Sequence, residues 1–291
     1  MKKALEKTVA FATMESIDNR QFNSVGSSRI RARWLLPYWE EAEEYRIGKK
    51  YEVLIYQKAY WEAMMKEFVG IQILDVCDPD FLEGRDVFRY VDMVDAFVTS
   101  TEALAEYARK IRPKALIKCI PDRVYLPEHR DRKVAHTGRA KTAVWFGYWH
   151  NAHYLQKTFD DLIKNNIALV VISDQAYTPP YAYSALKVIN IPYKYPKVHE
   201  ELIKYDMALL PPSTDDLRGK FKSNNKVLTA KALGMPVVQM PNDLQRFLDP
   251  EERKRASLEG IKEVEEKWDV QISVCEYKQL IEEIKERKNI L

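Results

Sequence analysis

Short apolar runs alternate with amphipathic stretches along most of this chain, and the alternation occurs twice. In the first half, the runs that predict strands are Thr8–Met14, Tyr51–Tyr56, Ile71–Val76, Ala96–Thr99 and Ala115–Ile120. In the second half they are Thr142–Phe146, Ala168–Ser173, Val188–Ile191, Met207–Leu210 and Pro236–Met240. Apolar strands that alternate with helices are typical of parallel sheets covered by helices. The sequence therefore predicts an α/β protein with two Rossmann-like domains whose parallel sheets face a central cleft.

The segments between these runs predict helices and a domain boundary. A helix is expected around Ile30–Glu44, another follows the capping box of Thr99–Glu102, and Ile261–Lys288 has a largely helical pattern. Residues 127–141 are charged, contain Pro and Gly and show no periodicity, which is typical of a linker. We therefore expect a first domain over 1–126, a linker over 127–141 and a second domain over 142–270.

Composition excludes several protein classes. The chain has 291 residues, with 46 basic and 43 acidic side chains and a net charge of +3. A dedicated nucleic-acid binder concentrates more positive charge than this. No apolar run approaches the ~20 residues of a membrane helix, and the three cysteines show no CxxC spacing. We expect a cytoplasmic protein with no membrane span, disulfide framework or zinc knuckle.

The stretch from Lys222 to Val238 carries the clearest chemical signal. Ser223 or Asn224 can cap a helix that begins near Lys226, and Gly234 ends that helix before a strand. Free N–H groups at a helix start attract anions, and lysines add full positive charges. The pattern predicts a diphosphate site, with a plain surface helix as the alternative.

At this stretch the sequence resembles the donor-binding helix of GT-B glycosyltransferases, particularly the glycogen-synthase-like and sucrose-synthase-like group. The resemblance extends in the right order to most of the chain. The other matching stretches are Asp95–Leu104, Ile120–Val124, Val144–His150 and Ile191 through to Pro212. The resemblance also implies that the last helix, 271–291, packs back on the first domain.

The resemblance implies transfer of a hexose from a nucleotide-diphosphate sugar, with UDP favoured, to an acceptor hydroxyl. The sugar nucleotide is a co-substrate, and neither a cofactor nor a metal is implied. The donor-binding residues that it implies are Lys222, Asn225, Lys226, Gly147, His150, Tyr193 and Ser213. The sequence departs from the family where two glutamates are usual, because Phe221 and Thr229 stand in their places.

Two segments of the first domain are candidates for the acceptor side. The loop Asn23–Arg31 holds small residues and arginines, whose guanidinium groups bind phosphate through two hydrogen bonds. Ser28 and Arg29 are the residues chosen from it, with Lys58 after the second strand as a further candidate for acceptor or phosphate binding. Solvent-facing side chains are the alternative.

Asp75–Asp80 ends the predicted third strand with three aspartates. A DxD metal site is one interpretation. The position of the family's His-Asp pair is the better match, with Asp78 or Asp80 as a general base or orienting group for an acceptor hydroxyl. An aspartate that caps the turn before Pro79 is the alternative.

More than one function is compatible with the sequence. A phage-type enzyme that glycosylates hydroxymethylated bases in DNA is a narrower version of the same hypothesis, and it would flip its target base out of the helix. A nucleotide-sugar epimerase and a degenerate nucleotide-sugar sensor represent two different functional classes. A dehydrogenase is disfavoured, because no G-x-G-x-x-G follows any predicted strand.

Overall fold

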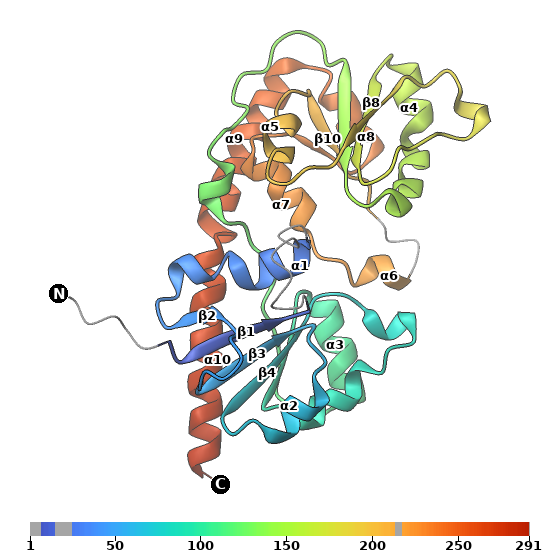
Figure 1. Ribbon diagram of the computed structural model, residues 1–291. Helices are drawn as coiled ribbons and strands as arrows, with labels where there is room; N and C mark the ends of the chain where they lie inside the picture. The colour runs from blue at the N-terminus through green and yellow to red at the C-terminus, as the bar shows by residue number, and fades with distance from the viewer. Residues whose placement is uncertain (1–6, 15–24, 213–216, 291) are drawn as a thin grey trace, which may run out of the picture. The chain divides into compact units, whose positions relative to one another are not determined.

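The computed structural model describes residues 7–14, 25–212 and 217–290 and divides into two units (Figure 1). Unit 1 comprises Met1–Tyr125, Thr214–Ser223 and Asp269–Leu291, and unit 2 comprises Leu126–Ser213 and Asn224–Trp268. Each unit contains one parallel sheet, of six and five strands respectively. This confirms the prediction of two parallel α/β halves.

Unit 1 is built on a sheet with the strand order β2-β1-β3-β4-β5-β6. Its strands are β1 (Val9–Thr13), β2 (Ala42–Glu44), β3 (Val53–Gln57), β4 (Ile71–Val76), β5 (Ala96–Thr99) and β6 (Ile117–Cys119). Its α-helices are α1 (Gly26–Ser28), α2 (Glu62–Glu67), α3 (Glu102–Ile111), α6 (Leu217–Lys220) and α10 (Val270–Ile290). Shorter helical segments are η2 (Arg29–Arg33), η3 (Leu36–Tyr38), η4 (Asp80–Glu83) and η5 (Val87–Met93).

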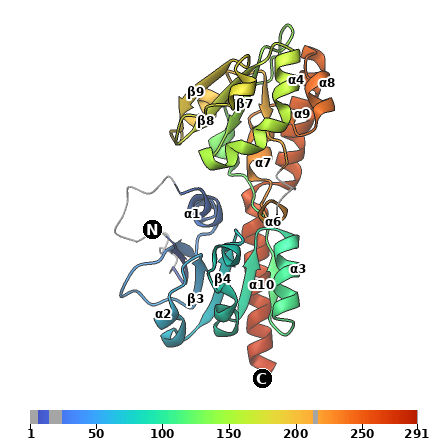
Figure 2. The same cartoon turned by 90° about the vertical axis from the view of Figure 1, so that its right-hand side faces the viewer.

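Both faces of the first sheet are buried, which explains why its strands are almost continuously apolar. Alternate residues of a strand point to opposite faces. Phe11 and Ile55 pack with Tyr277 of α10 on one face, whereas Leu54 and the residues of α2 and α3 form the core on the other. The long helix α10 therefore belongs to the core of unit 1 (Figures 1 and 2).

Unit 2 has the strand order β11-β10-β7-β8-β9. Its strands are β7 (Thr142–Phe146), β8 (Ala168–Ser173), β9 (Val188–Pro192), β10 (Met207–Leu209) and β11 (Val237–Val238). Its α-helices are α4 (Phe159–Lys164), α5 (Val198–Leu202), α7 (Asn225–Ala232), α8 (Pro241–Arg246) and α9 (Pro250–Lys267), and its shorter helical segments are η6 (Leu126–His129), η7 (Trp149–Thr158) and η8 (Tyr181–Tyr183).

The predicted helix over Ile30–Glu44 is wrong in its second half. The π-helical turn η2 ends at Arg33, a 3-10 turn follows at Leu36–Tyr38, and the chain then forms the edge strand β2. Pro37 has no N–H to donate to the preceding turn, so an α-helix cannot run through it, and Pro37 lies at the start of the short 3-10 turn instead. The charged residues Glu43 and Glu44 are suited to an edge strand, because charge discourages pairing with another chain.

The segment 127–141, expected to be a linker, lies in unit 2. The Lys133 N–H donates to the Leu233 carbonyl at 2.8 Å, and the Ser257 hydroxyl donates to the Lys133 carbonyl at 2.9 Å. Arg253 is fully buried and donates to the carbonyls of Thr137 and Gly138. These bonds hold the segment against α7 and α9, which a sequence without periodicity does not reveal.

Each sheet has one point at which the direction of strand addition reverses. In unit 1 the chain passes from β1 outward to β2 and returns to β3, and in unit 2 β7 has β8 on one side and β10 on the other. Ligands of parallel sheets bind at the carboxyl ends of strands beside such switch points. The residues that follow β3 and β7 are therefore the first to consider as functional residues.

Candidate functional site

Gly147 follows β7 at the switch point of the second sheet, and Lys226 of α7 lies against it. Gly147 has φ +147°, and an added Cβ would lie 3.0 Å from Lys226 Cε and overlap with Nζ. The Lys226 amine also lies 4.8 Å from the centroid of the Trp145 ring. Glycine is required here for two reasons, because the backbone is unfavourable for other residues and because the lysine needs the space.

The start of α7 provides hydrogen-bond donors beside this lysine. Asn224 at the N-cap makes no side-chain capping bond, and the helix contains no acidic residue. The side-chain Nδ2 of Asn225 is buried and has no hydrogen-bond partner among the residues that the structure describes. The positive end of the helix dipole and the charge of Lys226 both favour a negative group at this place. The arrangement is compatible with the predicted anion site.

His150 lies on η7, which begins directly after Gly147 and Tyr148. The rings of Tyr148 and His150 stack with centroids 5.7 Å apart, and Trp149 is 43% exposed. Asp174 Oδ1, after β8, accepts the Trp149 N–H at 2.8 Å and fixes the start of this segment. The structure thus places exposed aromatic rings and a histidine at the same edge of the sheet as Gly147.

Three other predicted donor residues either lie away from the end of β7 or fall outside the residues that the structure describes. Tyr193 follows β9, two strands from β7, which at ~4.8 Å per strand is roughly 10 Å away. Lys222 belongs to unit 1, whereas Lys226 belongs to unit 2. Ser213 lies outside the described residues. The assignment of these three to the donor remains a prediction, as does that of Gly147, His150, Asn225 and Lys226.

The two positions at which the family usually has glutamates are buried. Phe221 is 5% exposed and its ring packs against Phe81 and Tyr107 in unit 1, with centroids 5.5 Å away in both cases. Thr229 is 5% exposed inside α7. Both side chains are buried, so the resemblance identifies no sugar-contacting residue at these two positions.

Lys58 follows β3 at the switch point of the first sheet and connects the two predicted catalytic aspartates. It has φ +51°, a conformation that is uncommon outside glycine and marks a constrained position. Its Nζ lies 2.9 Å from Asp78 Oδ2 and 2.9 Å from Asp80 Oδ1. The Tyr60 hydroxyl donates to Asp80 Oδ2 at 2.8 Å. The ammonium group of Lys58 therefore lies between the two carboxylates.

The two aspartates differ in what they can do. Asp80 is 7% exposed and both of its carboxylate oxygens are engaged, whereas Asp78 is 42% exposed. Burial alone would raise the pKa of Asp78, but the charge and hydrogen bond of Lys58 hold it below its ordinary value. Asp78 is therefore ionised at neutral pH and has exposed surface from which to accept a hydrogen bond.

A buried ionic network lies behind this pair, and the sequence pattern did not predict it. Arg31 Nε lies 3.0 Å from Asp75 Oδ2, and its Nη1 lies 3.1 Å from Asp122 Oδ1. The Tyr277 hydroxyl of α10 donates to Asp75 Oδ2, and the Ser223 hydroxyl donates to Asp122 Oδ2. The network joins η2, β4, the segment after β6 and α10 within unit 1.

Burial and the charges of neighbouring groups act against each other in this network. It raises the pKa of Asp122 and of Tyr277, and the Arg31 charge only partly offsets the shift of Asp122. Burial would also lower the pKa of Arg31, but Asp75 and then Tyr277 and Asp122 raise it well above its ordinary value. A charged residue such as Asp75 in an otherwise apolar strand was the one sequence signal of a buried pair.

The two residues chosen from the arginine-rich loop have other contacts. The Ser28 hydroxyl is buried and donates to Gln57 Oε1 at 3.2 Å, at the end of β3. The Arg29 guanidinium lies 5.7 Å from the centroid of the Trp34 ring. The structure brings Ser28 to the strand end next to Lys58, and places Arg31 rather than Arg29 in the buried network.

The part of the chain that the structure describes contains neither a metal-binding cluster nor a membrane helix. Among residues 7–14, 25–212 and 217–290 no group of three or more His, Cys, Asp or Glu side chains is arranged to hold a metal ion. No helix in the same ranges has both the length and the apolar character to cross a membrane.

Comparisons with known proteins give matches by structure only, since no family model and no curated protein matches the sequence. The similar structures include Alr3699/HepE of Anabaena in complex with UDP and glucose, with 10% identity, a TM-score of 0.62 and coverage of 95% of this chain and 100% of that chain. The DNA-modifying enzyme beta-glucosyltransferase has 11% identity, a TM-score of 0.59 and coverage of 94% and 99%. TarM of S. aureus, in a complex that contains UDP, has 11% identity and a TM-score of 0.60, and the matched region covers 79% of this chain but only 55% of TarM.

These structures are GT-B glycosyltransferases, and the likeness shows that this chain has the GT-B fold. It has the fold over nearly its whole length, because the matches to HepE and to the beta-glucosyltransferase cover both proteins almost completely.

Proposed function

We propose that the protein is a glycosyltransferase that moves a hexose from a UDP-sugar to an acceptor hydroxyl without a metal ion. The observation that carries the proposal is the group formed by Gly147, Lys226 and the start of α7 at the switch point of the second sheet. Two structures of the same fold, HepE and TarM, contain UDP. A diphosphate is the anion that best suits a lysine, an amide donor and a helix start together.

In this proposal unit 2 stabilises the leaving group. Negative charge builds on the diphosphate as the sugar leaves, and preorganised donors lower the barrier most effectively when they are aimed at such charge. Lys226 supplies a full charge, Asn225 supplies amide donors, and the N–H groups of the first turn of α7 supply partial charge. His150 and the exposed Tyr148 and Trp149 flank the same strand end, where aromatic rings suit a base or a sugar.

Unit 1 supplies the acceptor-side groups. Asp78 is an ionised carboxylate that can accept the hydrogen bond of an acceptor hydroxyl and take its proton during transfer. Lys58 keeps the pKa of Asp78 low, so Asp78 is a weak base. Orientation of the acceptor hydroxyl is therefore the larger part of the role that we propose for Asp78. Asp80 and Tyr60 act through Lys58 as positioning residues, since their polar groups already bond to one another and to the lysine.

The donor half of the proposal is tested by calorimetric titration of the wild-type protein with UDP in the presence of EDTA. UDP should bind, UMP should bind more weakly because it lacks the second phosphate, and EDTA should make no difference. A ligand at 100 times its Kd adds about 2.7 kcal/mol to the unfolding free energy, so a rise in Tm provides a second readout. Binding that requires added Mg²⁺ or Mn²⁺ would contradict the metal-independent mechanism.

A DNA acceptor is the second candidate, and the fold likeness to a DNA-modifying beta-glucosyltransferase favours it. The test incubates labelled UDP-glucose with DNA that contains hydroxymethylated pyrimidines and, as a control, with unmodified DNA of the same sequence. Label on the modified DNA alone supports the candidate. The same reactions distinguish a transferase from an epimerase and from a sensor, because an epimerase yields an isomeric UDP-sugar without any acceptor and a sensor leaves the UDP-sugar unchanged.

A further inference from the structure

A hollow lies at the edge of the second sheet opposite to Gly147, where strands β7, β8 and β9 begin. It has a volume of about 380 Å³, near the lower end of the ~300–1,000 Å³ range of small-molecule pockets. The strand β7 has five residues, so at ~3.3 Å per residue this hollow is about 17 Å from the edge that holds Gly147. It is therefore distinct from the proposed donor site.

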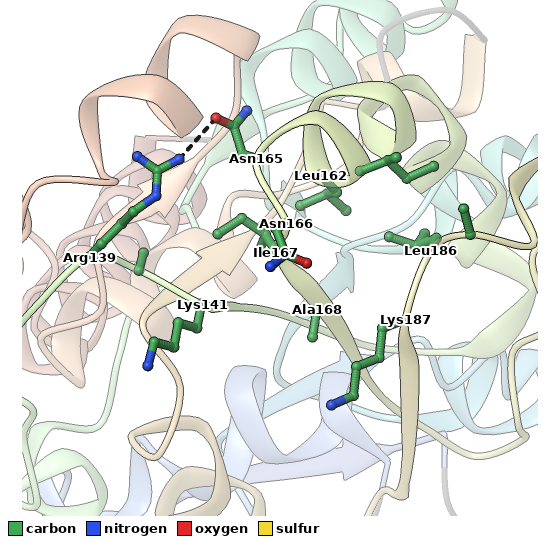
Figure 3. Close-up of a pocket in the computed structure, with 12 residues that line it drawn as sticks. Arg139, Lys141, Leu162, Asn165, Asn166, Ile167, Ala168, Leu186 and Lys187 are labelled. Carbon is green, nitrogen blue, oxygen red and sulfur yellow. Dashed lines mark hydrogen bonds between the residues drawn. The ribbon is translucent and has the colours of Figure 1, made fainter.

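The lining combines cations with an apolar floor (Figure 3). Arg139, Lys141 and Lys187 carry the charge, and Figure 3 shows the two lysines on either side of Ala168. The floor consists of Leu162, Ile163, Ile167, Ala168, Ala185 and Leu186. None of the described residues that line the hollow is acidic.

The three cations lack the carboxylate partners that some other cations of unit 2 have. Arg132 pairs with Glu265 and Lys231 pairs with Glu263. By contrast, Arg139 donates only to Asn165 Oδ1, at 3.4 Å, and within the described ranges none of the three forms an ion pair. Like charges grouped around a hollow repel one another and produce a positive potential that attracts an anion.

The carboxylate of Asp206 lies beside the start of β7, but it bonds to groups other than the ammonium of Lys141. Asp206 Oδ2 accepts the backbone N–H groups of Lys141 and Thr142 and the Thr142 hydroxyl, at 2.8–3.0 Å. The first of these bonds is to the backbone of Lys141, so it leaves that residue's ammonium group available to a ligand.

We propose that this hollow, the basic pocket, binds a soluble phosphate monoester whose carbon body packs on the apolar floor. A phosphate monoester carries about two negative charges at neutral pH, which suits a hollow lined by three cations better than a single carboxylate does. Arginine binds phosphate through its planar fork, and lysines add point charges. The limited volume suits a molecule of the size of a sugar phosphate.

The test is calorimetric titration with glucose 6-phosphate, with glucose and inorganic phosphate as comparison ligands, each with and without saturating UDP. Glucose 6-phosphate should bind in both conditions, inorganic phosphate more weakly, and glucose not at all. The double variant K141A/K187A should bind it at least about tenfold more weakly, since each change removes a charge-assisted contact. The matched control K197A/K254A removes two exposed lysines of the same unit and should keep the wild-type affinity.

Three results would overturn the proposal: no binding of glucose 6-phosphate to the wild type, unchanged affinity in K141A/K187A, or loss of binding in K226A. The last result would place the phosphate at the donor site. Melting temperatures and UDP titrations of every variant show whether a loss reflects unfolding. The basic pocket and the proposed transfer reaction can thus fail independently.

Discussion

The carboxyl ends of the two sheets differ in how their charged side chains are arranged. In unit 1 the strand ends hold acids and bases that satisfy one another, with Arg31 between Asp75 and Asp122 and Lys58 between Asp78 and Asp80. In unit 2 the strand end holds Gly147, Lys226 and the Asn225 amide, without an acidic residue in α7. The first edge pairs its charges internally and can orient a neutral group, whereas in the proposal the second edge holds the diphosphate.

The comparison is tested most strongly at Arg31. The variant Arg31→Met leaves Asp75 and Asp122 buried without their cation, and removing one partner of a buried ion pair costs about 3–5 kcal/mol. We expect a loss of that size in the unfolding free energy measured with urea. Arg33→Met is the matched control, because its partner Glu44 is 52% exposed, and it should cost no more than about 1 kcal/mol.

Arg31→Met can fail to fold at all, so a milder variant keeps the test informative. Tyr277→Phe removes only the hydroxyl that bonds to Asp75, and we expect it to cost about 1–3 kcal/mol. Equal stabilities of Tyr277→Phe and the wild type would show that the network does not hold α10 to the first sheet in the way described.

The next largest effect is expected at Lys226, and it should fall on activity instead of stability. Removing a donor that stabilises charge in a transition state typically lowers kcat by about 10²–10³-fold, or about 2.7–4 kcal/mol. Lys226→Ala should show this loss with UDP-sugar while its Tm stays near that of the wild type. Lys231→Ala removes a lysine of the same helix that pairs with Glu263, and it should keep its activity. Equal losses in both variants would mean that α7 is merely destabilised.

The sequence could predict most of the fold and only part of the candidate site. Apolar strands that are buried on both faces, such as Ile71–Val76, have an unmistakable pattern, and Gly147 and the Lys222–Val238 stretch could be read from spacing and resemblance. Arg31 and Asp122 are 91 residues apart, and nothing local distinguishes Arg31 from its neighbours Arg29 and Arg33. Their pairing depends on the order of strands in the sheet, which the strand pattern alone does not specify.

The sequence also did not predict that residues 217–223 belong to unit 1, for a similar reason. Phe221 stands where the family usually has a glutamate, and its aromatic contacts with Phe81 and Tyr107 join segments more than a hundred residues apart. Hydrophobicity predicts that such a ring is buried, but not in which of two cores.

A smaller effect is expected from Gly147→Ala. The added Cβ would displace the Lys226 amine and would also hold alanine at φ +147°, so we expect a loss of about 1–3 kcal/mol in stability. We also expect UDP to bind at least about tenfold more weakly, because the displaced amine is the proposed phosphate contact. Calorimetric titration and urea unfolding measure the two effects separately.

Gly138→Ala is the control for this variant. Gly138 also has positive φ, at +60°, and lies in the same unit, but no atom lies within 4 Å of an added Cβ. It should introduce a smaller backbone strain, because φ +60° lies in the left-handed α region, and it should keep the UDP affinity. Equal UDP affinities in both alanine variants would remove Gly147 and Lys226 from the proposed phosphate site.

The smallest expected effect concerns Asp78 and distinguishes a paired carboxylate from a merely buried one. Its pKa lies below the ordinary value in the folded protein, so the folded state binds fewer protons than the unfolded state at low pH. The stabilisation that results is present above the unfolded pKa of about 4 and is lost as the pH falls through the lower folded pKa. In Lys58→Gln the effect of burial remains without the ammonium group, so the pKa of Asp78 should rise above its ordinary value. The contribution of Asp78 to stability should then reverse its sign.

Carbon-detected NMR titration of the Asp78 carboxyl between pH 2 and 7 reports this pKa directly. Lys66→Gln is the control, because Lys66 pairs with Glu62 instead. A carboxyl that titrates at the same pH in the wild type and in Lys58→Gln would mean that the two groups are not coupled, and the edge of the first sheet would then not pair its charges internally as the comparison requires.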